Sequence, residues 1–172
     1  MYQYVKLLAL LLQDAVIANF EYWSEFVLRI QRDESRRSQA LQDWFGKSRI
    51  PSLFCLRLRG KWRIGNEPDW AASVQQFPMK GVTPMPAEAP LQASTLMMLL
   101  GIEISEARVN ENGELALVLS DGRLLTVEGV NEEWEESWFL ELPVDDPDRD
   151  RWSIICDSQG QISGRFPEPG NA

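Results

Sequence analysis

The stretch ELALVLSDGRLLTV, residues 114–127, carries the clearest structural pattern in this chain of 172 residues. Asp121-Gly122 at its centre is a dipeptide typical of tight β-hairpin turns. On both sides of this turn apolar residues alternate with others, as they do on strands that bury one face. The residues of the apolar face are Leu115, Leu117, Leu119, Leu125 and Val127. The stretch therefore predicts an antiparallel hairpin.

Similar strand patterns surround this hairpin. They predict a preceding strand at Ile104–Val109 and later strands at Ser137–Leu142, Trp152–Cys156 and Gln161–Arg165. A short helix over residues 93–100, stopped by Gly101, would precede them. Residues 91–167 are thus expected to form a C-terminal antiparallel β-meander, followed by a frayed tail, 168–172.

The N-terminal part shows a different period. Apolar residues recur at steps of three and four, which predicts an amphipathic helix over about residues 2–32. They are Val5, Leu8, Leu12, Val16, Phe20, Trp23, Val27 and Ile30. Such a helix would pack into the core, and it could also form a homodimer with a second copy of the chain. A second helix is expected over about residues 35–45.

Alternation returns at residues 56–64, LRLRGKWRI. One strand there would bury its apolar residues and place four basic ones on the opposite face, with a bend at Gly60. The basic residues are Arg57, Arg59, Lys61 and Arg63. Together these elements predict an α+β fold with a helical lobe and basic strand at 1–77, a proline-rich connector at 78–90, and the β lobe at 91–167.

Charge is divided unevenly along the chain. The net charge is −9, yet residues 1–86 carry 12 Lys/Arg against 8 Asp/Glu, whereas residues 87–172 carry 5 against 18. An acidic total argues against duplex DNA as a partner of the whole surface. The C-terminal half would instead attract a basic protein over a long range.

Several kinds of chemistry are excluded or disfavoured. The chain has no histidine, which removes Ser-His-Asp and Cys-His catalysis. Cys55 and Cys156 have no zinc-ligand spacing and are expected to be buried thiols, although a disulfide between them stays open. No apolar run approaches the length of a membrane span, and the run at 7–12 is too short for a signal peptide. We expect a cytoplasmic protein with no cofactor.

Carboxylates offer two further possibilities. Asp146, Asp148 and Asp150 have the spacing of a calcium loop with Asp157 at its twelfth position, but Arg151 stands where such loops need glycine. We therefore predict a solvated turn and no metal site. Glu135, Glu136 or Glu141 beside tryptophans could serve a carbohydrate-cleaving enzyme, but no catalytic pair stands out.

The acidic stretch NEEWEE, residues 131–136, is the preferred binding site. Its carboxylates would accelerate association with a basic partner, and Trp134 would be the anchor that such interfaces bury. By alternation Trp138 belongs to the core, so Trp134 is the tryptophan expected at the surface. The predicted partner-binding residues are Glu132, Glu133, Trp134, Glu135 and Glu136.

A resemblance supports this choice. The run LLGIEISEARVNENGELALVLSDGRLLTVEGV, followed by EESWFLEL and WSIICDSQGQI, resembles small bacterial α+β domains. Some of these are similar to immunity proteins of polymorphic toxin systems. The likeness covers residues 99–162 and depends on the hairpin at Asp121-Gly122-Arg123, the triplet at 136–138 and the hairpin from Trp152 to Gly160. It implies a non-catalytic role in sequestering a toxin.

The sequence therefore predicts a non-catalytic protein that binds a basic partner, such as a toxin. The alternatives are single-stranded nucleic-acid binding through the basic face at 57–63, where tryptophans accompany the basic residues, and a carboxylate enzyme acting on carbohydrate.

Overall fold

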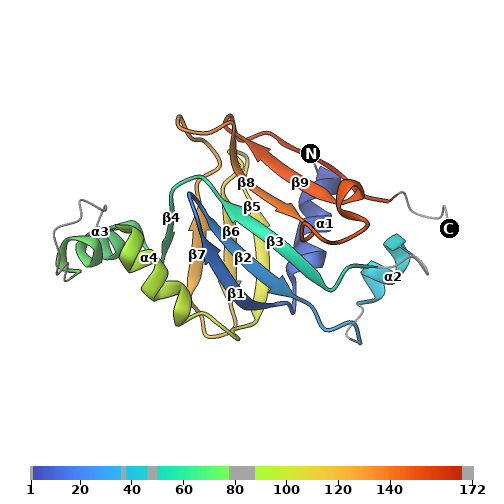
Figure 1. Cartoon of the computed structure of the whole chain (residues 1–172), viewed down its shortest axis with the longest axis horizontal. Helices are drawn as coiled ribbons and strands as arrows, with labels where there is room; N and C mark the ends of the chain where they lie inside the picture. Colours follow the sequence, from blue (N-terminus) through green and yellow to red (C-terminus); the bar gives the residue numbers. More distant parts are fainter. Residues whose placement is uncertain (1, 36–37, 46–49, 78–87, 168–172) are drawn as a thin grey trace.

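The computed structural model describes residues 2–35, 38–45, 50–77 and 88–167. Within these ranges the chain forms helices and antiparallel sheets, which confirms the α+β class (Figure 1). Most of the predicted connector, residues 78–87, and the predicted tail, 168–172, lie outside the described residues. Residues 88–90, at the end of that connector, begin helix α4 (Glu88–Met97). Proline is tolerated there because the first turn leaves its N–H groups without intrahelical partners.

A six-stranded antiparallel sheet forms the front layer in Figure 1. Alternate residues of its strands point inward: Phe26, Leu28 and Ile30 of the second strand are at most 4% exposed. The opposite face carries arginine and glutamate side chains. In spatial order the strands are β1 (Val16–Tyr22), β2 (Phe26–Gln31), β3 (Leu53–Leu58), β8 (Glu136–Glu141), β9 (Ser153–Asp157) and β10 (Ile162–Arg165).

A four-stranded antiparallel sheet contains the predicted hairpin. Its spatial order is β4 (Trp62–Ile64), β7 (Leu124–Val127), β6 (Leu115–Leu119) and β5 (Ile104–Val109). The leucines that alternate along β6 are buried, and Gly122 has a φ of 87°, which the tight turn requires. The predicted strands of the C-terminal part are all present, but they divide between two sheets. β5 to β7 belong to the smaller sheet, and β8 to β10 extend the larger one.

The core lies between the two sheets and helix α1 (Tyr2–Leu12). Leu7, Leu8, Leu11 and Leu12 bury one side of this helix against β5 and β10. Figure 1 shows α1 behind the larger sheet. Both sheets combine strands from before and after residues 78–87, so the two parts of the chain share one core.

The remaining helices lie at the margins. Helix α2 (Gln39–Phe45) matches the second predicted helix in its C-terminal portion, and α4 covers most of the predicted helix at 93–100. Helix α3 (Glu67–Gln76), which had no sequence prediction, begins at an Asn66 cap and packs Trp70 against Trp62, with ring centroids 6.1 Å apart. Among the described helices none has the length and apolarity needed to cross a membrane.

The predicted helix over residues 2–32 is wrong beyond Leu12. Asp14 adopts a left-handed conformation with a φ of 60°, which ends the helical path, and residues 16–31 form the β1–β2 hairpin. Half of the residues of this segment are β-branched or aromatic, and such residues favour a sheet that can bury them on one face. The apolar positions of this segment fit both one face of a helix and the buried faces of two strands, so their spacing alone did not distinguish a helix from a hairpin.

The predicted single strand over residues 56–64 is also divided. It breaks at Gly60, where a bend had been expected, into β3 of the larger sheet and β4 of the smaller one. A Cβ at Gly60 would lie 2.6 Å from the carbonyl oxygen of Glu128, so the backbone passes too closely for another residue. The alternation of burial still holds, because Leu56, Leu58 and Trp62 are buried.

Candidate protein-binding surface

The acidic loop, residues 131–136, connects the smaller sheet to β8 and is organised around Asn131. The Asn131 side-chain oxygen accepts hydrogen bonds from the backbone N–H groups of Glu133 and Trp134, at 3.1 and 2.8 Å. Its amide nitrogen donates to Ser137 Oγ at 2.7 Å. Ser137 is fully buried, and its hydroxyl donates to the Gly129 carbonyl at 2.7 Å. One side chain therefore ties the loop to the interior.

The loop backbone is also held by the turn between β9 and β10. The N–H of Asn131 donates to the Ser158 carbonyl at 3.2 Å, and the N–H of Ser158 donates to the Glu135 carbonyl at 2.9 Å. Val130 forms an antiparallel bridge with Gln159. With its backbone bonded at both ends, the loop has a defined conformation before any partner arrives.

Three carboxylates on this loop face solvent. Glu132, Glu133 and Glu135 are exposed, and none of them forms an ion pair within the described part of the chain. Glu136 differs, because it is partly buried at the start of β8 and pairs with Arg59. The five predicted partner-binding residues thus lie on one continuous segment, in which Glu136 connects the loop to Arg59, the residue that follows β3.

Trp134 lies at the surface of the loop, 40% exposed, whereas Trp138 is fully buried. The guanidinium carbon of Arg59 is 5.5 Å from the Trp134 ring centroid and 4.9 Å from that of Phe139. These distances are within the range of cation–π attraction. One face of the Trp134 indole therefore contacts the Arg59 guanidinium.

An ion-pair network supports the surface from the outer face of the larger sheet. Glu25, whose side chain is 9% exposed, accepts hydrogen bonds from Arg57 at 2.7 Å and Arg59 at 2.6 Å. Glu141 accepts from Arg57 at 2.7 Å and from Arg149 at 3.0 Å. Burial alone would lower the pKa of the Arg57 guanidinium, but its hydrogen bonds with Glu25 and Glu141 raise it above its usual value.

The residues of the predicted nucleic-acid face are distributed over the larger sheet, the smaller sheet and the link between them. Arg57 lies on β3 and Arg59 directly follows that strand, and their charges are balanced by Glu25, Glu136 and Glu141. Lys61 is exposed in the link between β3 and β4. Arg63 belongs to β4 of the smaller sheet. Arg57 and Arg59 are therefore paired with carboxylates, Lys61 lies near Arg59, and Arg63 lies on the other sheet.

A hollow of about 280 Å³ adjoins the acidic loop. It combines residues from both predicted sites, so two segments that the sequence analysis treated as alternatives meet there. Its lining residues are Arg59, Lys61, Glu128, Val130, Asn131, Glu132 and Glu133. Carboxylates outnumber cations in this lining, and Val130 is half-exposed. The acidic loop therefore borders a concave surface next to its exposed carboxylates.

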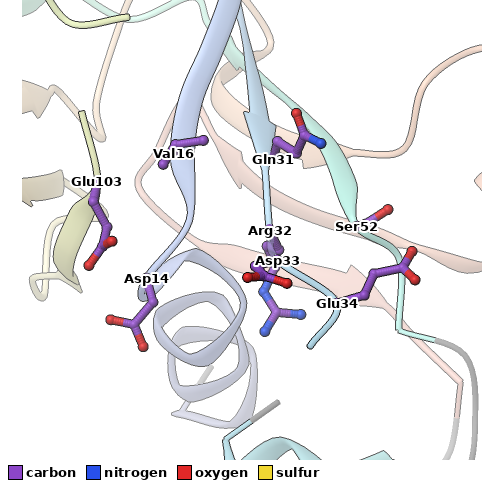
Figure 2. Close-up of a pocket in the computed structure, with 8 residues that line it drawn as sticks. All are labelled: Asp14, Val16, Gln31, Arg32, Asp33, Glu34, Ser52 and Glu103. Carbon is purple, nitrogen blue, oxygen red and sulfur yellow. The ribbon is translucent and has the colours of Figure 1, made fainter. Parts of the chain in front are cut away.

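A second hollow, of about 550 Å³, was not foreseen from the sequence (Figure 2). Four segments distant in the sequence meet there, at the starts of β1, β3 and β5 and the end of β2. Figure 2 shows Asp14 and Glu103 on one side, Arg32 and Asp33 in the centre, and Glu34 on the other side. The lining is completed by Val16, Gln31 and Ser52. No local motif joins these positions, so only the fold could reveal them.

The other carboxylates and the thiols have structural surroundings. Glu136 and Glu141, two candidates for carbohydrate cleavage, each bind an arginine. Asp146 lies in the turn before β9, where its carboxylate accepts the N–H of Asp148 at 2.9 Å. No group of three or more potential ligands suited to a metal ion occurs among the described residues. Cys55 and Cys156 are buried free thiols, as expected.

Comparison of the chain with models of known protein families, with curated proteins and with solved structures gave no match in any of the three.

Proposed function

We propose that this chain is a non-catalytic protein-binding protein that recognises a basic partner through Glu132, Glu133, Trp134, Glu135 and Glu136. Its role would be that of an immunity-type inhibitor, which blocks a basic toxin or a similar protein by covering it. The observation that carries the proposal is the acidic loop, in which three exposed carboxylates lack ion-pair partners within the described residues while the backbone is hydrogen-bonded at both ends.

Two physical effects support this function. Unpaired surface carboxylates accelerate encounter with a positively charged protein, because they attract it before contact. A loop that is already ordered loses less conformational entropy when it binds. Trp134 adds a partly exposed aromatic ring at the centre of the charges, and such rings often contribute much of the energy of an interface.

The same geometry favours protein binding over the nucleic-acid alternative. A phosphate backbone is bound by cations that are available to it. Arg57 and Arg59 already hydrogen-bond to carboxylates, and the surface beside them is acidic.

The test uses two variants that change the net charge equally. Glu132→Lys with Glu133→Lys reverses charge on the loop, and Asp145→Lys with Asp150→Lys reverses charge at exposed positions between β8 and β9. Each variant and the natural chain are immobilised and exposed to extract of the native cell, and the captured protein is identified and purified. We expect the loop variant to lose the partner that the natural chain and the control variant retain.

The purified partner then gives the association rate constant by stopped-flow mixing. The loop variant should associate at least about tenfold more slowly than the control variant, and the difference should shrink at high salt. If a toxin is captured, co-expression of the natural chain should restore growth and the loop variant should not. Equal association by both variants would refute the proposal.

A further inference from the structure

Arg59 occupies a junction between three segments. Its Nε donates to Glu25 in the β1–β2 turn, its Nη1 donates to Glu136 at the start of β8, and its guanidinium stacks on Trp134 in the acidic loop. The backbone is fixed as well, since the N–H groups of Arg59 and Gly60 both donate to the Ser137 carbonyl, at 2.9 and 2.6 Å. Hydrogen bonds therefore fix both the backbone and the guanidinium group of Arg59.

The orientation of the guanidinium follows from these bonds. Hydrogen bonds to Nε and Nη1 lie in the guanidinium plane, so two carboxylates that accept them fix that plane. The faces of the group then remain available to aromatic rings. Trp134 and Phe139 take up these contacts, at 5.5 and 4.9 Å from the guanidinium carbon. The indole of Trp134 therefore lies against a cation whose position is set by Glu25 in the β1–β2 turn and by Glu136 at the end of the loop.

Arg57 provides a natural comparison two residues earlier. It also donates to Glu25, and its guanidinium carbon is 5.4 Å from the Phe139 ring centroid. Its second carboxylate, however, is Glu141, and among the described aromatic residues its guanidinium stacks on Phe139 and not on Trp134. The two arginines therefore have similar surroundings and differ in the contact with the acidic loop.

We propose that Arg59 is the positioning residue of the acidic loop: held by Glu25 and Glu136, it keeps the Trp134 indole in the orientation in which a partner meets it. This inference rests on the proposed function for its biological meaning, but the positioning itself is a property of the free protein. Arg59 acts through Trp134, and Glu25 acts through Arg59. The β1–β2 turn thus takes part in organising a loop more than 100 positions later in the chain.

The test uses ¹⁹F NMR of the full chain labelled with 5-fluorotryptophan. The seven tryptophans give separate probes, and the resonance that disappears in Trp134→Phe belongs to Trp134. In Arg59→Gln this resonance should move toward that of free 5-fluorotryptophan and narrow about twofold, because the ring gains motion. Glu25→Gln should shift it in the same direction by less. The other resonances show whether each variant is folded.

Arg57→Gln is the matched control and should leave the Trp134 resonance in place. If Arg59→Gln does not fold, the Trp134 resonance is measured in Glu25→Gln and Arg59→Lys instead. Lysine keeps the positive charge but has no planar group that can stack on the indole. An unchanged Trp134 resonance in the folded Arg59 variants, or an equal change in Arg57→Gln, would overturn the positioning role.

Binding gives a second, separate measurement with the purified partner. Arg59→Gln should raise the dissociation rate constant about three- to tenfold, because a mobile Trp134 must be ordered on binding. The association rate constant should change less, because Glu132, Glu133 and Glu135 remain. Failure of the proposed function would appear as loss of the charge-reversal effect on association, with the ¹⁹F result unchanged. Failure of the positioning role would leave the charge-reversal effect intact.

Discussion

Trp138 on β8 donates its indole N–H to the backbone carbonyl of Gly113, at 2.7 Å, and this bond joins the two sheets. Gly113 lies in the turn between β5 and β6 of the smaller sheet, and Trp138 belongs to the larger one. The tryptophan is fully buried, so its N–H has no access to bulk water and depends on this carbonyl. The contact therefore links the two sheets at the strand that follows the acidic loop.

Replacement of Trp138 by phenylalanine should lower the free energy of unfolding by about 2–4 kcal/mol. The smaller ring leaves a cavity and removes the principal donor to the Gly113 carbonyl, and both effects destabilise a buried site. Urea denaturation followed by circular dichroism measures the change. Trp23→Phe, at a side chain that is 78% exposed, is the control and should stay within about 0.5 kcal/mol of the natural chain. Equal losses in the two variants would contradict the role of Trp138.

Glycine is required where the turns next to the acidic loop meet. A Cβ on Gly129 would lie 2.1 Å from the Asn112 carbonyl oxygen, and the obstructing atoms are backbone. Gly129→Ala should therefore cost at least about 3 kcal/mol of unfolding free energy. Gly65→Ala is the comparison, because its φ of 76° disfavours alanine but nothing lies within 4 Å, and it should cost about 1 kcal/mol. A Gly129 variant no less stable than the Gly65 variant would show that the turns can separate.

The sequence predicted the C-terminal strands well because two local signals agreed there. Alternation placed Leu115, Leu117 and Leu119 on one buried face, and the glycine of a tight turn marked where the strand ends. The burial of Trp138 followed from the same rule. The division of these strands between two sheets was not predictable, because it depends on pairing of β8 with β3, more than 70 residues earlier.

Sequence reasoning failed where one set of residues fitted two periods. Val16, Val27 and Ile30 satisfy a helical stripe, yet they belong to strands. Long-range pairing decided the outcome, and it also placed Glu25 next to Arg57 and Arg59. The acidic loop was found because it is one continuous segment. Its support by Arg59, and the hollow around Arg32, join distant segments and needed the fold.

Cys156 should make stability depend on pH in the alkaline range. Burial of its thiol, with a smaller contribution from Asp157, raises its pKa to about 12, whereas the pKa of an unfolded cysteine is about 8.5. Between these two pKa values the Cys156 thiol is deprotonated in the unfolded chain and protonated in the folded chain. Stability from this group is therefore fully present below about pH 8.5 and declines as pH rises toward the folded pKa.

Cys156→Ala should remove this dependence. The difference in unfolding free energy between the natural chain and the variant should shrink by up to about 1.4 kcal/mol per pH unit above pH 9. Urea denaturation at pH 7, 9 and 10 measures it, and lysine and tyrosine titration cancels because both proteins share it. A difference that stays constant with pH would show that the Cys156 thiol ionises as easily in the folded state as in the unfolded one.

The last prediction concerns the order of the acidic loop itself. Asn131→Ala removes the acceptor for the N–H groups of Glu133 and Trp134 and the donor to Ser137. Amide hydrogen exchange at these two N–H groups should accelerate at least about tenfold, because local opening no longer breaks those bonds. The loss of global stability should be only about 1 kcal/mol, since the bridge between Val130 and Gln159 remains.

Asn131→Asp separates the two functions of this side chain. Aspartate keeps an acceptor for the two N–H groups but has no donor for Ser137, so exchange at Glu133 and Trp134 should stay close to that of the natural chain. The two amides are followed by NMR in both variants. Unaltered exchange in Asn131→Ala would mean that the contacts with Ser158 alone order the loop. The β9–β10 turn would then be the element that orders the acidic loop, and Ser158 would be the next residue to substitute.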